Sequence, residues 1–258
     1  MNGIELHQVG FSYGRLSCLE CIDLRLESGY FHGLIGPNGS GKSTLLDLMS
    51  GYLEPERGSI NINGRPIAGY RRTDLARLLT LVPQSFSFNF DFSVYETVMM
   101  GRHPHLGRFA HPGVGDHQAV RAALETLEVD RLAGRSIRQL SGGEKQRVTV
   151  ARALAQQTDY LLLDEVTANL DINHAISIMR TLKALSSRGR TVIAALHDLN
   201  MALAFCDRVI VLKEGRVHRS GSAAEVVDTG LVADIYQVST DMLRSEDGTR
   251  QLVYRYHQ

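Results

Sequence analysis

The sequence has 258 residues, of which 43% are hydrophobic and 22% charged, and its 28 Lys and Arg residues balance 28 Asp and Glu residues. This length fits one large domain or two modest ones, and zero net charge argues against a generally basic nucleic-acid-binding protein. The N-terminus lacks a signal-peptide pattern, and no apolar run approaches the roughly 18 residues of a membrane-spanning helix.

Predicted strands and helices alternate along the chain, which indicates βαβ units and a mostly parallel sheet. Asn63 and Gly64 give a hairpin-type turn after the strand at 58–62. The region between residues 84 and 156 has little strand signal and is predicted to be a helical insertion. The predicted strands are 4–8, 30–35, 58–62, 78–82, 160–163 and 191–196, and the predicted helices are 45–49, 116–127, 142–156 and 171–187, with a helix followed by a loop in 92–112.

The strongest local signal is a glycine-rich loop between a predicted strand and a predicted helix. It follows the G-x-x-x-x-G-K-[ST] pattern, whose backbone N–H groups point at phosphate oxygens. Lys42 adds a positive charge for the β- and γ-phosphates, and the Ser43 hydroxyl is a ligand for Mg²⁺. The predicted nucleotide-binding residues of this loop are Gly36, Pro37, Asn38, Gly39, Ser40, Gly41, Lys42, Ser43 and Thr44.

Two adjacent carboxylates end the apolar strand predicted at residues 160–163. In an open α/β sheet, ligands meet the C-terminal ends of the strands. We assign Asp164 to Mg²⁺, directly or through water, and Glu165 to orienting and deprotonating the attacking water. A solvated acidic loop end is the alternative interpretation of this pair.

A second anion-binding pattern lies at residues 140–147, which read Leu-Ser-Gly-Gly-Glu-Lys-Gln-Arg. Ser141 is a suitable N-cap, and Gly142 and Gly143 leave the N–H groups of a helix start exposed. Physical reasoning alone does not specify which anion binds there.

Together, these three patterns resemble the ATP-binding-cassette (ABC) ATPases, whose signature sequence is similar to residues 140–147. The resemblance covers about residues 4 to 227. It implies a P-loop NTPase (RecA-like) core with a mainly parallel sheet, an antiparallel β-subdomain and an inserted helical subdomain. The expected core is about 1–84 and 157–230, the helical subdomain about 85–156 and the tail 231–258. It also implies ATP and Mg²⁺ as cofactors, and a head-to-tail dimer with each ATP between one chain's phosphate loop and the other's signature helix.

Smaller family motifs follow in order along the chain. Tyr13 resembles the aromatic residue that stacks on adenine, although a core tyrosine is an alternative. Gln84 resembles the loop glutamine that contacts Mg²⁺ and water, which adds it to the implied metal ligands Ser43 and Asp164. Asp171 matches the aspartate that crosses the dimer interface, and His197 matches the histidine that contacts the γ-phosphate.

One position departs from the family pattern. The family usually has proline directly after the Asp-Glu pair, whereas this chain has Val166. Because proline restricts the backbone, the stiffness of this loop is left open. The predicted catalytic set, Glu165, His197 and Gln84, is unchanged by the departure.

Residues 100–107, Met-Gly-Arg-His-Pro-His-Leu-Gly, are similar to a segment of the ATPases of iron-siderophore, haem and cobalamin importers, as are residues 170–174. Such ATPases dock on a permease dimer at the cytoplasmic face of the inner (plasma) membrane and work with a substrate-binding protein outside it. The histidines of this region fit no usual metal-ligand spacing, and His103 and His105 cannot share one helical face.

Alternating phenylalanines follow Gln84, where the permease of an ABC importer is expected to contact its ATPase. Phe86, Phe88, Phe90 and Phe92 give a period of two, which predicts an extended segment with one apolar face. A docking surface for the permease and plain core packing are both open for each ring.

The tail has a turn at 246–249 and alternating Leu252, Tyr254 and Tyr256, which predict a last strand. The tail is too short for the extra regulatory domain of sugar-importer ATPases. Cys18 and Cys21 form a C-x-x-C pair, but no second pair accompanies them, and Leu19 and Ile22 beside them look like core residues, which disfavours redox or metal chemistry.

Two further classes of ABC protein remain as alternatives to a metal-chelate importer. One is a soluble ABC ATPase of iron-sulfur cluster assembly, and the other is an exporter ATPase. The importer-like segment at 101–107 favours the importer. The substrate is not specified, because it would contact the permease and the binding protein rather than this chain.

Overall fold

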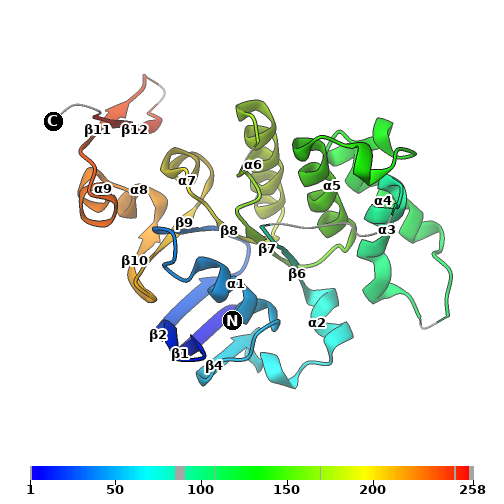
Figure 1. Cartoon of the computed structure of the whole chain (residues 1–258), viewed down its shortest axis with the longest axis horizontal. Coiled ribbons are helices and arrows are strands. Elements are labelled where there is room, and N and C mark those ends of the chain that lie inside the picture. The colour runs from blue at the N-terminus through cyan, green and yellow to red at the C-terminus, as the bar shows by residue number, and fades with distance from the viewer. Residues whose placement is uncertain (1, 85–90, 108, 169, 247, 256–258) are drawn as a thin grey trace.

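The computed structural model describes residues 2–255 apart from residues 85–90, 108, 169 and 247. The described chain forms three sheets flanked by helices (Figure 1). This combination of parallel strands, an antiparallel sheet and packed helices confirms the predicted α/β class. Across the residues described, no helix has both the length and the apolar character that a membrane span requires.

A six-stranded sheet forms the centre of the molecule. Its strand order is β10-β9-β3-β8-β7-β6, and all neighbours are parallel except β10, which runs antiparallel to β9. Every residue of β3, β7 and β8 is buried, as expected for parallel strands covered on both faces. The strands are β3 (Phe31–Ile35), β6 (Leu79–Val82), β7 (Tyr160–Asp164), β8 (Thr191–Ala195), β9 (Arg208–Lys213) and β10 (Arg216–Ser222).

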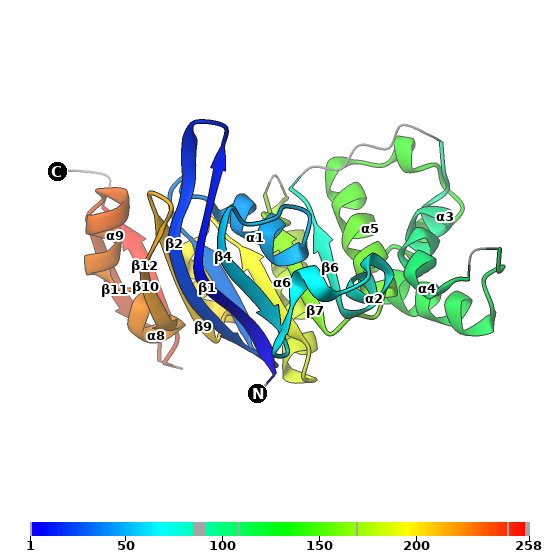
Figure 2. The same cartoon turned by 90° about the horizontal axis from the view of Figure 1, so that it is seen from below.

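A four-stranded antiparallel sheet of order β2-β1-β4-β5 lies against one face of the central sheet (Figure 2). Its apolar side chains share a core with helix α1 and with Tyr160 and Leu162 of β7. Leu161 and Leu163, which alternate with them, face the core on the opposite side of the sheet. The strands are β1 (Gly3–Tyr13), β2 (Leu16–Glu27), β4 (Arg57–Ile62) and β5 (Arg65–Pro66).

The sequence prediction of strands was incomplete in every sheet: β9 and β10 of the central sheet and β11 of the C-terminal hairpin were not predicted, and the antiparallel sheet was predicted only in part. A strand was predicted at 4–8, but β1 runs to Tyr13, and β2 was not predicted. The β1–β2 ladder contains register shifts, and Gln8 and Cys21 have φ values of 49°. Such bulges break the alternation of apolar and polar residues on which the prediction depends. The predicted turn at Asn63 and Gly64 is confirmed, because Ile62 pairs with Arg65 across it.

Helices cover the remaining surfaces of the central sheet and form one end of the molecule. Helices α3, α4 and α5 gather at the end opposite the C-terminal elements α9, β11 and β12 (Figure 1). The helices are α1 (Lys42–Ser50), α2 (Arg72–Leu78), α3 (Val94–Met99), α4 (Val114–Thr126), α5 (Gly142–Ala155), α6 (Ile172–Ser187), α7 (Leu199–Phe205), α8 (Ala223–Val226) and α9 (Thr229–Tyr236), with short 3₁₀ turns η1 (Ile67–Gly69), η2 (Met100–His105), η3 (Asp130–Leu132) and η4 (Ile137–Gln139).

The predicted helices 116–127, 142–156 and 171–187 are confirmed as α4, α5 and α6, within two residues at most ends. The short helices α2, α7, α8 and α9 were not predicted, because a few turns give little periodicity. The predicted last strand is β12 (Arg250–Tyr254), which pairs with β11 (Thr240–Arg244) as a hairpin. Tyr256 and three of the predicted phenylalanines, Phe86, Phe88 and Phe90, lie outside the described residues.

Candidate functional site

The glycine-rich loop connects β3 to α1, as predicted. Gly36, Gly39 and Gly41 have φ values of 150°, 76° and 100°, a region that other residues rarely adopt. A Cβ atom at Gly36 would lie 2.1 Å from the Leu212 carbonyl oxygen, so the close approach of the two backbones requires glycine. Glycine at these positions therefore allows the tight backbone conformation of the loop between β3 and α1.

Lys42 lies in the first turn of α1 and is almost completely buried. Its ammonium group donates hydrogen bonds to the carbonyl oxygens of Gly36 (3.0 Å) and Pro37 (3.2 Å). Burial lowers the pKa of Lys42, and the nearby carboxylates of Glu165 and Asp164 oppose this shift. A desolvated ammonium beside an N–H-lined loop is a strong electrostatic partner for phosphate oxygens.

Asp164 is the last residue of β7 and is 7% exposed. Burial raises the pKa of its carboxyl group, while a hydrogen bond from the Ser43 hydroxyl and the charge of Lys42 act in the opposite direction. Its Oδ1 atom is buried without a hydrogen-bond partner. Since a buried acceptor without a partner is costly, this oxygen is suited to a cation or its bound water.

Glu165 lies at the centre of a three-residue cluster. Its Oε2 atom accepts a hydrogen bond from Gln84 Nε2 at 2.6 Å, and its Oε1 atom lies 2.5 Å from His197 Nε2. The Glu165 side chain is 10% exposed, whereas that of His197 is 44% exposed. The ends of β6, β7 and β8 thus bring three predicted residues together at one edge of the sheet, where ligands bind in open α/β folds.

These groups surround a pocket of 520 Å³. Cys18, which was not predicted as a site residue, also lines it, and its Sγ atom donates a hydrogen bond to Thr44 Oγ1 at 3.2 Å. The sequence marked Cys18 only as half of the C-x-x-C pair, because the strand in which it lies was not predicted. The lining residues are Cys18, Asn38, Gly39, Gly41, Lys42, Ser43, Thr44, Gln84, Glu165, Ala168 and His197.

Tyr13 lies near this pocket but does not line it. Its hydroxyl is 3.5 Å from Thr44 Oγ1, and its ring packs edge-on against Phe11 with centroids 5.0 Å apart. The residue is 51% exposed, so it is not the core tyrosine that was the alternative interpretation. An exposed ring beside the phosphate loop is available to stack on a base.

The signature residues lie away from the pocket in the same chain. Ser141 is the N-cap of α5, as predicted, and forms a reciprocal capping box with Glu144. Asp171 is the N-cap of α6 and accepts hydrogen bonds from the N–H and the ring Nδ1 of His174. The phosphate-loop pocket is not lined by Ser141, Gly142, Gly143 or Asp171 of the same chain.

Comparison with known proteins identifies the class. The family described as ABC transporter matches residues 19–168, which is more than half of the chain. The chain therefore belongs to the ABC transporter family and is an ATP-binding, ATP-hydrolysing cassette, as predicted.

Among curated proteins, the chain is 39% identical over 232 residues to the hemin import ATP-binding protein HmuV of Thermobifida fusca, covering 90% of this chain and 81% of that protein. It is 36% identical over 244 residues to the iron(3+)-hydroxamate import ATP-binding protein FhuC of Bacillus subtilis, covering 94% and 91%. Its sequence relatives therefore include import ATPases for iron compounds.

Solved structures agree with this assignment. A metal-chelate type ABC transporter in an inward-facing conformation is similar with a TM-score of 0.85 at 28% identity, covering 99% of this chain and 98% of that chain. The dimeric bacterial cassette MJ0796 is similar with a TM-score of 0.77 at 31% identity, covering 85% and 98%. The predicted fold of an ABC ATPase is confirmed.

Proposed function

We propose that this chain is the ATPase subunit of an importer that takes up a metal chelate, of the ferric siderophore, haem or cobalamin class, through a partner permease. The observation that carries the proposal is the Glu165 carboxylate held between Gln84 and His197 at the rim of the phosphate-loop pocket. Two relatives are named as import ATP-binding proteins for hemin and for iron(3+)-hydroxamate, and these names support the substrate class.

In this proposal, Glu165 is the group that receives the proton of the attacking water. Gln84 and His197 fix its two oxygens in separate contacts, so the carboxylate is oriented before a substrate binds. Lys42 and the N–H groups of its loop hold the β- and γ-phosphates of ATP. Phosphoryl transfer depends mainly on such positioning and charge stabilisation, and little on covalent chemistry by the protein.

Mg²⁺ fits the residues beside this cluster. Ser43, Gln84 and Asp164 would hold it, and the buried Oδ1 atom of Asp164 supplies an acceptor that has no protein partner. When bound, the cation supplies charge neutralisation on the phosphate oxygens. The hydroxyl of Ser43 already contacts the Asp164 carboxylate, so the two oxygen donors lie together.

A second copy of the chain completes the site in the proposed mechanism. Its Ser141, Gly142 and Gly143, at the N-terminus of α5, would face the γ-phosphate, and its Asp171 would cross the interface. The capping box at Ser141 keeps this helix start formed, and a helix N-terminus is a favourable anion partner. The dimeric cassette similar to this chain supports self-association.

The proposed permease dock is a groove between α2, β6 and η2. Two adjoining hollows, of 520 and 310 Å³, share Ala76, Thr80, Leu81 and Gln156. No acidic side chain lines either hollow in the described chain, whereas Arg72, His103 and Arg152 do. Four residues of the importer-like segment, Met100, Gly101, His103 and Pro104, line one of these hollows. The segment that resembles importer ATPases is therefore part of the proposed dock.

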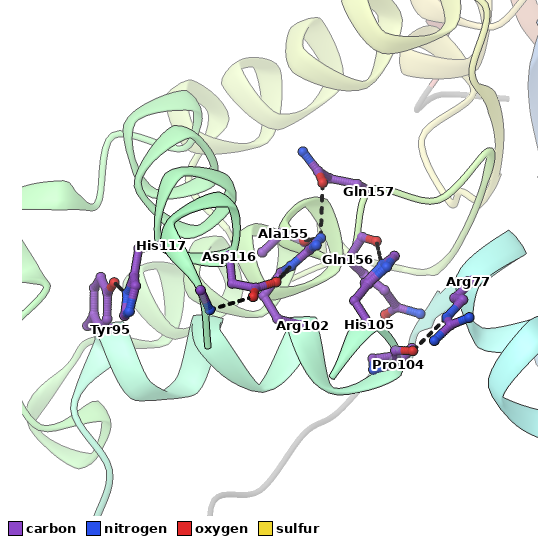
Figure 3. Close-up of polar contacts among 11 residues, drawn as sticks. Arg77, Tyr95, Arg102, Pro104, His105, Asp116, His117, Ala155, Gln156 and Gln157 are labelled. Atoms are coloured by element: carbon purple, nitrogen blue, oxygen red, sulfur yellow. Dashed lines mark hydrogen bonds and ion pairs between the residues drawn. The ribbon is translucent and has the colours of Figure 1, made fainter. Parts of the chain in front are cut away.

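Polar contacts of Gln156 join separate elements beside this groove, and Figure 3 shows its contact with His105. The Gln156 side chain donates hydrogen bonds to the carbonyl oxygens of Ala76 (2.5 Å) and Leu79 (3.2 Å) and accepts one from Thr80 Oγ1. The backbone oxygen of Gln156 contacts His105 Nε2 at 2.8 Å. A permease segment in the groove would therefore contact residues that are hydrogen-bonded to β6. This strand ends two residues before Gln84.

Membrane attachment through the permease implies a location at the cytoplasmic face of the inner membrane, with an external substrate-binding protein as an indirect partner. A soluble iron-sulfur-assembly ATPase and an exporter ATPase are the competing functions. Co-expression with the permease tests the proposal, because an importer subunit should co-purify with it in detergent at a 1:1 ratio of chains. Recovery of this chain free of the permease under those conditions would contradict it.

A further inference from the structure

The C-terminal hairpin is bonded directly to helix α7. Asn200 Nδ2 donates to the Leu252 carbonyl oxygen at 3.1 Å, and the Leu252 N–H donates to Asn200 Oδ1 at 2.7 Å. One carboxamide thus satisfies both backbone groups of a residue in β12, as a neighbouring strand would. The Leu252 side chain is 2% exposed and belongs to the large core on this side of the central sheet.

Helix α7 is the element that follows His197 directly. The N-cap of α7 is Asp198, whose Oδ1 atom accepts hydrogen bonds from the N–H groups of Asn200 (2.8 Å) and Met201 (3.2 Å). On its other side, Leu196 N–H donates to the Leu34 carbonyl oxygen at 3.0 Å. His197 is therefore placed between a fixed strand end and a fixed helix start, and β12 holds that helix.

Tyr236 of the same C-terminal segment lies near the phosphate loop. Its hydroxyl, at the end of α9, is buried without a hydrogen-bond partner. Burial is the main cause that raises the pKa of Tyr236 to about 12, and the backbone of nearby Gly36 opposes part of this rise. The carbonyl of the same Gly36 accepts a hydrogen bond from Lys42.

Helix α9 is itself attached to the central sheet. Lys213 Nζ, on β9, donates to the backbone oxygen of Asp234 at 3.3 Å and to its Oδ1 atom at 3.1 Å. Strand β9 pairs in parallel with β3, which leads into the phosphate loop. The segment from α9 to β12 therefore contacts the helix that follows His197 and the strand next to β3, while none of its described residues lines the phosphate-loop pocket.

We propose that this C-terminal segment is a brace for the catalytic site, and that Asn200 is a positioning residue that acts through His197. The proposal rests on the proposed role of His197 in hydrolysis. Losing the Asn200–Leu252 pair frees the start of α7, and His197 then holds the Glu165 carboxylate less well. A misplacement of about 1 Å in a catalytic group is enough to slow a reaction severely.

The test compares Asn200→Ala and Asn200→Asp with the control Val253→Ala in the full chain. Val253 is next to Leu252 but is 40% exposed, so its truncation leaves the pair intact. We expect Asn200→Ala to lower kcat for ATP about fivefold or more, with KM within twofold of the parent. Asn200→Asp keeps the acceptor for the Leu252 N–H, so its kcat should lie between those of Asn200→Ala and the parent.

The ring resonances of His197, assigned by their absence in His197→Ala, separate positioning from general stability. They should shift or broaden in Asn200→Ala and stay unchanged in Val253→Ala. Unmoved His197 resonances, or a kcat within twofold of the parent, would overturn the proposal. If His197→Ala retains full kcat, the proposed role of His197 in hydrolysis is wrong. In that case, the shift of the His197 resonances in Asn200→Ala still tests whether the C-terminal segment positions His197.

Discussion

The two ends of the molecule approach the same catalytic cluster in different ways. The helical end, α3 to α5 with η2, carries Ser141 on a helix outside the pocket, and Gln156, which directly follows α5, joins it to β6 by hydrogen bonds beside two hollows. The C-terminal end is bonded to the helix that follows His197 and to β9, the strand next to β3. The first arrangement suits an element that responds to partners, and the second suits a fixed support.

The largest expected effect comes from changing Glu165, the central residue of the cluster with Gln84 and His197. Glu165→Gln keeps the shape of the side chain and removes the base, so the ATPase rate should fall by about 10²-fold or more. ATP should still bind, and the ATP-bound dimer should become long-lived. The rate is measured by phosphate release, with Glu54→Gln, at an exposed position, as the control. Turnover within about tenfold of the parent would contradict the assignment of Glu165.

Ser141→Arg tests whether the helical end acts on the partner's nucleotide. The arginine places bulk and positive charge at a helix start suited to phosphate, so ATPase activity and ATP-driven dimerisation should fall about tenfold or more. The ATP affinity of the monomer should change little, because Lys42 and its loop are intact. Ser141→Thr retains a capping hydroxyl and is the matched control. A large loss of monomer affinity with normal dimerisation would place Ser141 in its own chain's site.

Negative charge in the groove should separate the permease contact from hydrolysis. Tyr52, which is 79% exposed, lines one hollow, and His103 lines the other. Tyr52→Asp and His103→Asp should lower co-purification with the permease several-fold, while basal ATPase activity and melting temperature stay close to the parent. Val114→Asp, at a 75% exposed position on α4 away from these hollows, is the control. Unchanged transport in both groove variants would exclude this dock.

The smallest expected effect concerns the pH dependence of the helical end. A hydrogen bond from Arg102 is the main cause that lowers the pKa of Asp116, with the Gly113 N–H adding to it. A lowered folded-state pKa contributes stability above the unfolded value of about 3.9, and this stability is lost as pH falls through the folded value. Asp116→Asn should therefore flatten the fall in melting temperature between about pH 5 and pH 2. Parallel curves for variant and parent would contradict this.

The residues proposed as catalytic could be recognised in the sequence because each follows a strand of the parallel sheet. Gln84, Glu165 and His197 are far apart in the chain, yet the carboxyl ends of β6, β7 and β8 meet at one edge. The positions on the antiparallel sheet were less predictable, since bulges at Gln8 and Cys21 hide the strand pattern. Cys18 could not be recognised in the pocket for the same reason.

The contacts of the two ends depend on side chains that pair across long stretches of sequence. The sequence identified Arg102 only as part of the importer-like segment. In the structure, the buried Arg102 donates hydrogen bonds to Asp116, the Ala155 carbonyl and Gln157 (Figure 3). Asn200 and Leu252 are separated by 52 residues, and the alternation that predicts the strand at Leu252 does not indicate its partner. Local periodicity carries no information about such pairs, because they are determined by packing of whole elements.

The most direct test of the central claim is chelate uptake by proteoliposomes that contain the permease and this chain, with the binding protein inside or outside as the orientation requires. The account predicts that a ferric siderophore, haem or cobalamin moves in the import direction only with ATP and the parent chain, and that Glu165→Gln abolishes multiple-turnover uptake. ATP hydrolysis without uptake of any of these chelates, or ATP-driven movement in the export direction, would contradict the account.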